Sequence, residues 1–177
     1  MFALSDLKET LPNFPDEVLE GWLLPYANSE GWPPAQDTNA TPEGRWKYLL
    51  SGRTLSQLRG IEWREENRHL SIHELSKSHQ SICVDIVLGA VQDQINLYSS
   101  SIKDLKQRFH NILAYLRQHG TFPAAPALLA SPDGFHVLDG NHRLSAYFYA
   151  YGYFNLPTDG PAMDKAASTQ RFWVGSI

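Results

Sequence analysis

The sequence is short of cysteine and of long apolar runs. Its single cysteine, Cys83, allows neither a disulfide within the chain nor a cysteine-rich zinc site, which favours a reducing compartment. No apolar run approaches the ~18 residues of a membrane span. The first residues lack the basic segment and apolar core of a signal peptide. We therefore expect a cytoplasmic protein that does not insert into a membrane.

Positive charge is also scarce. The 177 residues include 15 Lys and Arg against 19 Asp and Glu, a net charge of −4. Strong non-specific DNA binding needs a clear basic surface, so nucleic acid is a possible partner but not the favoured one. Hydrophobic residues make up 42% of the chain, which is enough for a sizeable core and argues against disorder.

The beginning of the chain is predicted to form short helices joined by loops rich in Pro and Gly. Thr41 and Thr54 are candidate N-caps, because a threonine hydroxyl before a helical pattern can accept a hydrogen bond from the first turn. We expect residues 1–60 to be a helical N-terminal extension. A second region, residues 61–177, should form the main domain, and together they should make a single compact unit.

The middle of the chain combines an ambiguous segment with a predicted strand and the clearest helix. Residues 61–80 are highly charged and fit either a helix or irregular structure. Residues 81–88, SICVDIVL, are rich in β-branched side chains and are predicted to form a strand. From Ser101, which with Asp104 fits a capping box, apolar residues recur at spacings of three and four up to Gly120. This pattern predicts an amphipathic helix that ends at the glycine.

The C-terminal part completes a predicted α+β fold. Residues 126–139 should form a β-hairpin, since Pro132-Asp133-Gly134 is a turn sequence between two apolar runs. The helical pattern that follows has two apolar faces, which indicates a central, buried helix. Residues 171–177 read as a last strand. We therefore predict a small mixed β-sheet packed by helices.

The residues between the hairpin and the last helix are Asp139-Gly140-Asn141-His142-Arg143. A helix that starts directly after a strand exposes free backbone N–H groups, and these groups and the helix dipole attract anions. Gly140 would let the backbone turn sharply, and Asn141 can cap the helix. His142 and Arg143 lie where a cation is unfavourable for the dipole, a cost that a bound phosphate would offset. Asp139 could orient His142, bind a divalent metal, or act as a base.

The same five residues could also form a purely structural turn that binds no ligand. Asp-Gly-Asn is a common turn sequence, and Arg143 could simply pair with Asp139 or with an acid elsewhere. The residues alone leave both interpretations open.

The motif and its neighbouring elements resemble the ParB/sulfiredoxin superfamily over about residues 80–155. Before the last core helix, ParB proteins carry Gly-Glu-Arg-Arg, sulfiredoxins Gly-Cys-His-Arg, and the related free-serine kinases Asp-Gly-His-His-Arg. The sequence Asp139-Gly140-Asn141-His142-Arg143 is closest to the kinase form. The resemblance implies a ParB/sulfiredoxin-like core that binds a nucleotide or another phosphorylated small molecule. The residues it assigns to the phosphate are Gly140, Asn141, His142 and Arg143.

The same resemblance implies a possible enzyme. Asp139 and His142 would be catalytic, and Asp139 would also bind Mg²⁺ together with ATP, ADP or CTP. The reaction would be phosphoryl transfer to a small hydroxyl substrate. The kinases use a further acidic residue, for which Glu62, Glu65, Glu66 and Glu74 are candidates.

Departures from the family pattern define the alternatives. Asn141 stands where sulfiredoxins have their reactive cysteine, which argues against sulfinic-acid reduction. We expect no helix-turn-helix region after the motif and hence no partition role. A nucleic-acid-associated ParB-like nuclease or DNA-binding module is one alternative function. A non-catalytic interaction domain, whose motif is a structural turn, is the other.

Other polar clusters have weaker functional readings. His69 and His73, with Glu74 adjacent, would share a face on a helix, as zinc ligands can, but a solvated polar face is the expected state. Cys83 is expected in the core. The basic residues of the long amphipathic helix are expected to be solvated, with a phosphate or nucleic-acid surface as the alternative; they are Lys103, Lys106, Arg108, His110 and Arg117.

Overall fold

The chain, in a computed structural model, divides into two compact units. The first comprises Met1–Arg64 together with Trp173–Ile177, and the second comprises Glu65–Phe172. The predicted helical extension, residues 1–60, falls within the first unit. The structure describes residues 1–154, 156–157, 160 and 162–177.

The first unit is built from short helices. Their bounds are α1 Leu4–Thr10, α2 Asp16–Val18, the π-helix η1 Leu19–Leu23, α3 Leu24–Glu30, α4 Gly44–Leu49 and α5 Leu55–Arg59. The prediction that Thr54 caps a helix is confirmed, because its hydroxyl accepts a hydrogen bond from the Gln57 backbone N–H at 3.2 Å. The prediction for Thr41 is wrong: α4 begins at Gly44, after Glu43.

Aromatic side chains form the core of the first unit. The ring of Phe14 lies 6.5 Å from that of Trp22 and 5.0 Å from that of Trp63, and Trp32 packs edge-on against Trp46 at 5.4 Å. The sequence has five tryptophans, and all of them belong to this unit; they are Trp22, Trp32, Trp46, Trp63 and Trp173.

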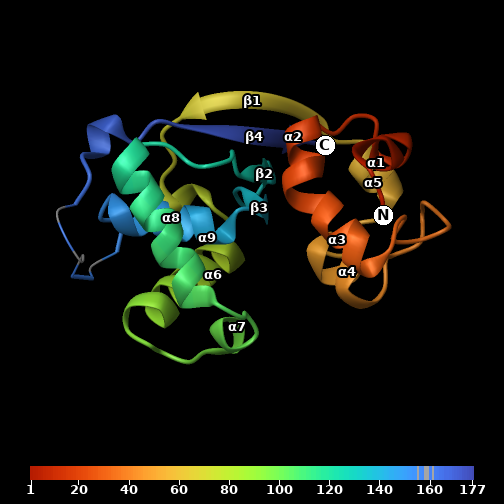
Figure 1. Ribbon diagram of the computed structural model, residues 1–177. Helices are drawn as coiled ribbons and strands as arrows, with labels where there is room; N and C mark the ends of the chain where they lie inside the picture. The colour runs from red at the N-terminus through yellow and green to blue at the C-terminus, as the bar shows by residue number, and fades with distance from the viewer. Residues whose placement is uncertain (155, 158–159, 161) are drawn as a thin grey trace. The chain divides into compact units, whose positions relative to one another are not determined.

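A four-stranded mixed sheet confirms the predicted α+β class. The strands are β1 Glu62–Arg68, β2 Ala127–Leu129, β3 His136–Asp139 and β4 Gln170–Ser176, in the order β1-β4-β2-β3. The ambiguous charged segment thus contributes β1, and β4 runs beside it (Figure 1). The predicted hairpin is confirmed: β2 and β3 are antiparallel, with Ala127 opposite Asp139.

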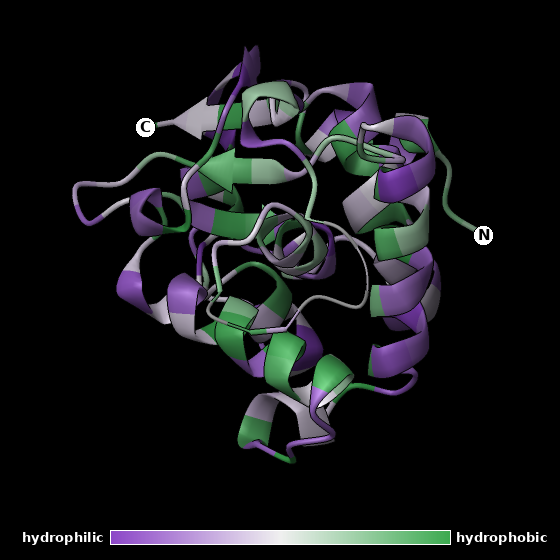
Figure 2. Cartoon of the chain, turned by 90° about the vertical axis from the view of Figure 1, so that its left-hand side faces the viewer, coloured by the Kyte–Doolittle hydropathy of each residue, from purple (hydrophilic) through white to green (hydrophobic). Residues whose placement is uncertain are grey.

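Three helices dominate the second unit. The helices α6, α8 and α9 pack against one another in pairs (Figure 1). Hydrophobic and hydrophilic residues alternate along the helices, as expected where one side is buried (Figure 2). No helix in the described ranges is both long and apolar enough to cross a bilayer. The bounds are η2 Ile72–Glu74, α6 Lys77–Val91, α7 Leu97–Ser100, α8 Leu105–His119, α9 Asn141–Ala150 and η3 Lys165–Ala167.

Helix α6 overturns the strand predicted over residues 81–88. The buried residues of this segment and its neighbour are Cys83, Ile86, Val87 and Ala90, which follow the helical spacing of three and four. Burial of this face against α8 and α9 therefore outweighs the local β-propensity.

Helix α8 confirms the predicted amphipathic helix but not its beginning. Gly120 ends it with φ of 69°. The capping box predicted for Ser101 and Asp104 is wrong: Asp104 is itself the N-cap, at φ of 57°, and its side chain makes no cap hydrogen bond. Helix α9 is as predicted, since every residue from Leu144 to Ala150 is buried.

Candidate functional site

The candidate site is a strand–turn–helix junction. Asp139 is the last residue of β3, Gly140 is the N-cap of α9, and Asn141 is its first residue. Gly140 has no side chain, so the N-cap residue itself supplies no cap hydrogen bond to this helix start. The first bond of the helix runs from the Leu144 N–H to the Gly140 carbonyl at 2.9 Å. The N–H groups of the preceding turn therefore lack helical partners, as at any helix start.

Glycine is required at position 140 for two reasons. Its φ of 107° lies in a region that L side chains rarely adopt. A Cβ at this position would also lie 2.9 Å from Pro126 Cβ and 3.2 Å from Pro126 Cα. The residue before β2 thus closes one side of the turn.

Arg143 makes two contacts at the base of the turn. Its guanidinium forms an ion pair with Asp139 and donates a hydrogen bond to the Ala124 carbonyl at 2.9 Å. The side chains of Arg143 and Asp139 are only 15% and 28% exposed. The ion pair between Arg143 and Asp139, which the sequence suggested for a purely structural turn, is therefore present. The hydrogen bond from Arg143 to Ala124 fixes the turn against the segment before β2.

His142 lies in a positive and partly buried environment. Burial, followed by the nearby guanidinium groups of Arg108 and Arg143, lowers the pKa of His142 to about 4. The imidazole is therefore neutral at neutral pH. It can donate or accept a hydrogen bond there but adds no positive charge.

Two buried side-chain atoms of the turn are unsatisfied. Asn141 Oδ1 and His142 Nε2 have no hydrogen-bond partner in the described part of the chain. Buried polar atoms normally have one, so such atoms call for an explanation. Rotation of the Asn141 amide by about 180° would place its NH₂ donor where the oxygen lies.

Arg108 is the residue that sequence reasoning did not assign to the site. It lies on the exposed side of α8, within electrostatic range of His142. Among the described residues, no carboxylate pairs with it. The sequence placed Arg108 only in a basic helical face, because nothing local shows which helix α8 packs against.

Three of the four other acidic candidates form ion pairs with arginines outside the turn. Glu65 pairs with Arg171 at 3.1 Å, and Glu66 and Glu74 both pair with Arg68. Glu62 is the first residue of β1.

The suggested metal ligands are not gathered either. His69 contacts the Ser168 hydroxyl through Nδ1 and the Tyr153 hydroxyl through Nε2, and His73 lies exposed in η2. Within the described residues there is no cluster of three or more His, Cys, Asp or Glu side chains that could hold a metal ion.

Cys83 is in the core, as predicted. Its thiol is fully buried, and this burial raises its pKa to about 12. A thiol in that state is not a nucleophile at neutral pH.

Comparison with known proteins leaves the family open. No protein-family model, curated protein sequence or solved structure matches this chain. The likeness to the ParB/sulfiredoxin superfamily accordingly stays a prediction that rests on the motif and its flanking elements.

Proposed function

We propose that the turn formed by Asp139–Arg143 binds the phosphate group of a nucleotide or of another phosphorylated small molecule. The observation that carries the proposal is the start of α9 at a glycine N-cap, with Arg108 and Arg143 both within electrostatic range of His142. A phosphate there would accept hydrogen bonds from backbone N–H groups and be attracted by the helix dipole and the guanidinium groups.

The charge balance of the turn supports an anionic ligand. The positive charges near the turn are two arginines and the positive end of the helix dipole. The negative charge is the carboxylate of Asp139, which already pairs with Arg143. The charge on Arg108 has no such counter-ion among the described residues. A phosphate bound near Arg108 would neutralise it.

Arg143 need not release Asp139 for this role. A guanidinium has five N–H donors, and the two contacts to Asp139 and Ala124 leave others free. We therefore propose that Arg143 stabilises the turn and neutralises part of the phosphate charge. Arg108 would contact the phosphate directly.

Catalysis is the further step of this proposal. Phosphoryl transfer to a small hydroxyl substrate would use Asp139 as base or as a ligand of Mg²⁺, with ATP, ADP or CTP as donor. Asp139 would then have to exchange its contact with Arg143 for one with the substrate or the ion. The binding proposal does not depend on this step.

The test is the thermal stability of the protein with ATP, ADP, CTP and inorganic phosphate, each with and without Mg²⁺. A ligand at 100 times its Kd adds about 2.7 kcal/mol to the free energy of unfolding. For a chain of this size that corresponds to a rise in Tm of about 5–10 °C. If none of these compounds raises the Tm at millimolar concentration, the proposal is wrong.

A pair of variants on α8 provides the control. Arg108→Ala should abolish most of the ligand-induced rise in Tm, because it removes a guanidinium within electrostatic range of His142. Arg117→Ala removes an equal charge from the exposed side of the same helix and should leave the rise unchanged. A salt-dependent shift of DNA in place of a nucleotide response would favour the nucleic-acid alternative, and no response to either would favour an interaction domain.

A further inference from the structure

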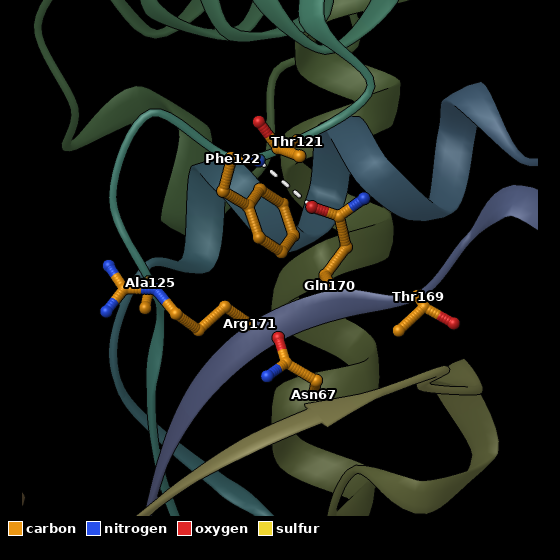
Figure 3. A pocket seen from close by; sticks show the side chains of 7 residues that line it. All are labelled: Asn67, Thr121, Phe122, Ala125, Thr169, Gln170 and Arg171. Carbon is orange, nitrogen blue, oxygen red and sulfur yellow. Dashed lines mark hydrogen bonds between the residues drawn. The ribbon is translucent and has the colours of Figure 1, made fainter.

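A small pocket lies at the same end of the sheet as the turn. It has a volume of about 300 Å³ and lies within the second unit. Its walls come from the end of β1, the beginning of β4 and the segment before β2 (Figure 3). The residues that line it are Asn67, Thr121, Phe122, Ala125, Thr169, Gln170 and Arg171.

The segment before β2 is a wall common to the pocket and the turn. Ala125 lines the pocket, while the carbonyl of Ala124 accepts the hydrogen bond from Arg143. Pro126, the next residue along the chain, is the one that a Cβ on Gly140 would strike. Consecutive Cα atoms are about 3.8 Å apart, so the pocket begins within a residue or two of the turn.

The rim of the pocket offers hydrogen-bonding groups without charge. Asn67, Thr121 and Thr169 are exposed, and no described residue forms a hydrogen bond with their side chains. An amide and two hydroxyls both donate and accept, which matches the hydroxyl groups of a ligand. Arg171 extends along the floor toward Ala125, but Glu65 pairs with it, and no carboxylate lines the pocket (Figure 3).

The pocket does not offer a surface for a nucleobase. Phe122 is only 9% exposed, and its ring packs against Tyr147 at 5.6 Å and Phe172 at 5.8 Å. The bases of single-stranded nucleic acids commonly stack on open aromatic faces, and this pocket presents none. The wall itself is held in place by the buried Gln170, which accepts a hydrogen bond from the Phe122 N–H at 3.0 Å and donates one to the Gly120 carbonyl at 2.7 Å.

We propose that this pocket binds the hydroxyl-bearing body of the ligand whose phosphate sits at the turn. The ligand class is then a phosphate monoester of a small polyol, such as a sugar phosphate, and not a nucleotide. This inference rests on the proposed function of the turn. Two adjoining subsites on one rigid wall would act together, because the phosphate holds the polyol at a high effective concentration in the pocket.

Isothermal titration calorimetry with three probes tests the inference: inorganic phosphate, ribose and ribose 5-phosphate. Ribose 5-phosphate should bind about tenfold or more tighter than inorganic phosphate, while ribose alone should bind weakly. The double variant Asn67→Ala, Thr169→Val should lose this gain and keep the affinity for inorganic phosphate. Asn111→Ala, an exposed amide on α8, is the matched control and should keep the gain.

The outcomes separate the pocket from the turn. If inorganic phosphate binds and ribose 5-phosphate binds no tighter, or if the double variant keeps the gain, the pocket inference is overturned while the proposed function stands. If neither phosphate compound binds, the proposed function itself has failed. Adenosine 5′-monophosphate should bind no tighter than ribose 5-phosphate; a large further gain would refute the polyol class.

Discussion

At the scale of single residues, some features of the turn follow from the local sequence and others depend on tertiary packing. Gly140 could be recognised from sequence, because a strand, a glycine and a helical pattern follow one another directly. The contacts of Gly140 with Pro126, and of Arg143 with Ala124, come from a segment 14 to 19 residues earlier in the chain. The proximity of Arg108 to His142 depends on how α8 packs against α9. No local pattern encodes these last contacts.

His142 should make the stability of the protein fall as the pH is lowered. Its pKa is about 4 in the folded chain and about 6.5 when unfolded, so the unfolded state takes up the proton first. This contribution is fully present above pH ~6.5 and is lost as the pH falls toward ~4, a change of up to about 3 kcal/mol. The free energy of unfolding, measured by urea titration across this range, should show the loss.

Replacement of the imidazole provides the comparison for that experiment. His142→Gln cannot take up the proton, so its stability should depend less steeply on pH between ~6.5 and ~4. His73→Gln, an exposed position on η2, should keep the slope of the wild type. Equal slopes for the wild type and His142→Gln would contradict the burial of a neutral imidazole.

At the scale of elements, α6 is the clearest failure of sequence reasoning. Residues 81–88 are β-branched and apolar, and a short apolar run cannot be assigned to strand or helix by periodicity alone. The helix becomes evident only when the segment is extended at both ends to Lys77–Val91. By contrast, the hairpin, α9 and β4 were marked by turn glycines or by clear hydrophobic patterns, and the structure contains them as predicted.

Two valines of α6 give a matched test of its helical register. Val87 is fully buried, whereas Val84 is only partly buried on the same helix. Val87→Ala should cost about 2 kcal/mol, since it removes two methyl groups from the core and leaves a cavity. Val84→Ala should cost clearly less, because less surface is lost and alanine favours helix. Equal losses in chemical denaturation would argue against this register.

At the scale of the whole molecule, the tryptophans provide a built-in probe of one unit. All five belong to the first unit, whereas the turn, the pocket and the Tyr147–Tyr153 segment belong to the second. Both β1 and β4 run from one unit into the other along the chain. This continuity predicts that the two units unfold together.

Thermal unfolding followed with two signals checks this cooperativity. Tryptophan fluorescence reports the first unit, and the far-ultraviolet circular dichroism at 222 nm is dominated by helices that include α6, α8 and α9. The two Tm values should coincide, and phosphate bound in the second unit should raise both. Separate transitions, with only the dichroism signal shifted by ligand, would show that the units unfold independently.

The order of the strands also causes a delay between the synthesis of β1 and that of its neighbour in the sheet. β1 has β4 as its neighbour in the sheet, yet the chain between Arg68 and Gln170 must be made before β4 exists. At roughly 5–20 residues per second, the nascent β1 waits on the order of 5–20 s for its partner. Glu62, Arg64, Glu65, Glu66 and Arg68 place charge along nearly its whole length. Such charges discourage a strand from pairing with other chains, so the polar character of β1 protects the nascent polypeptide during that interval.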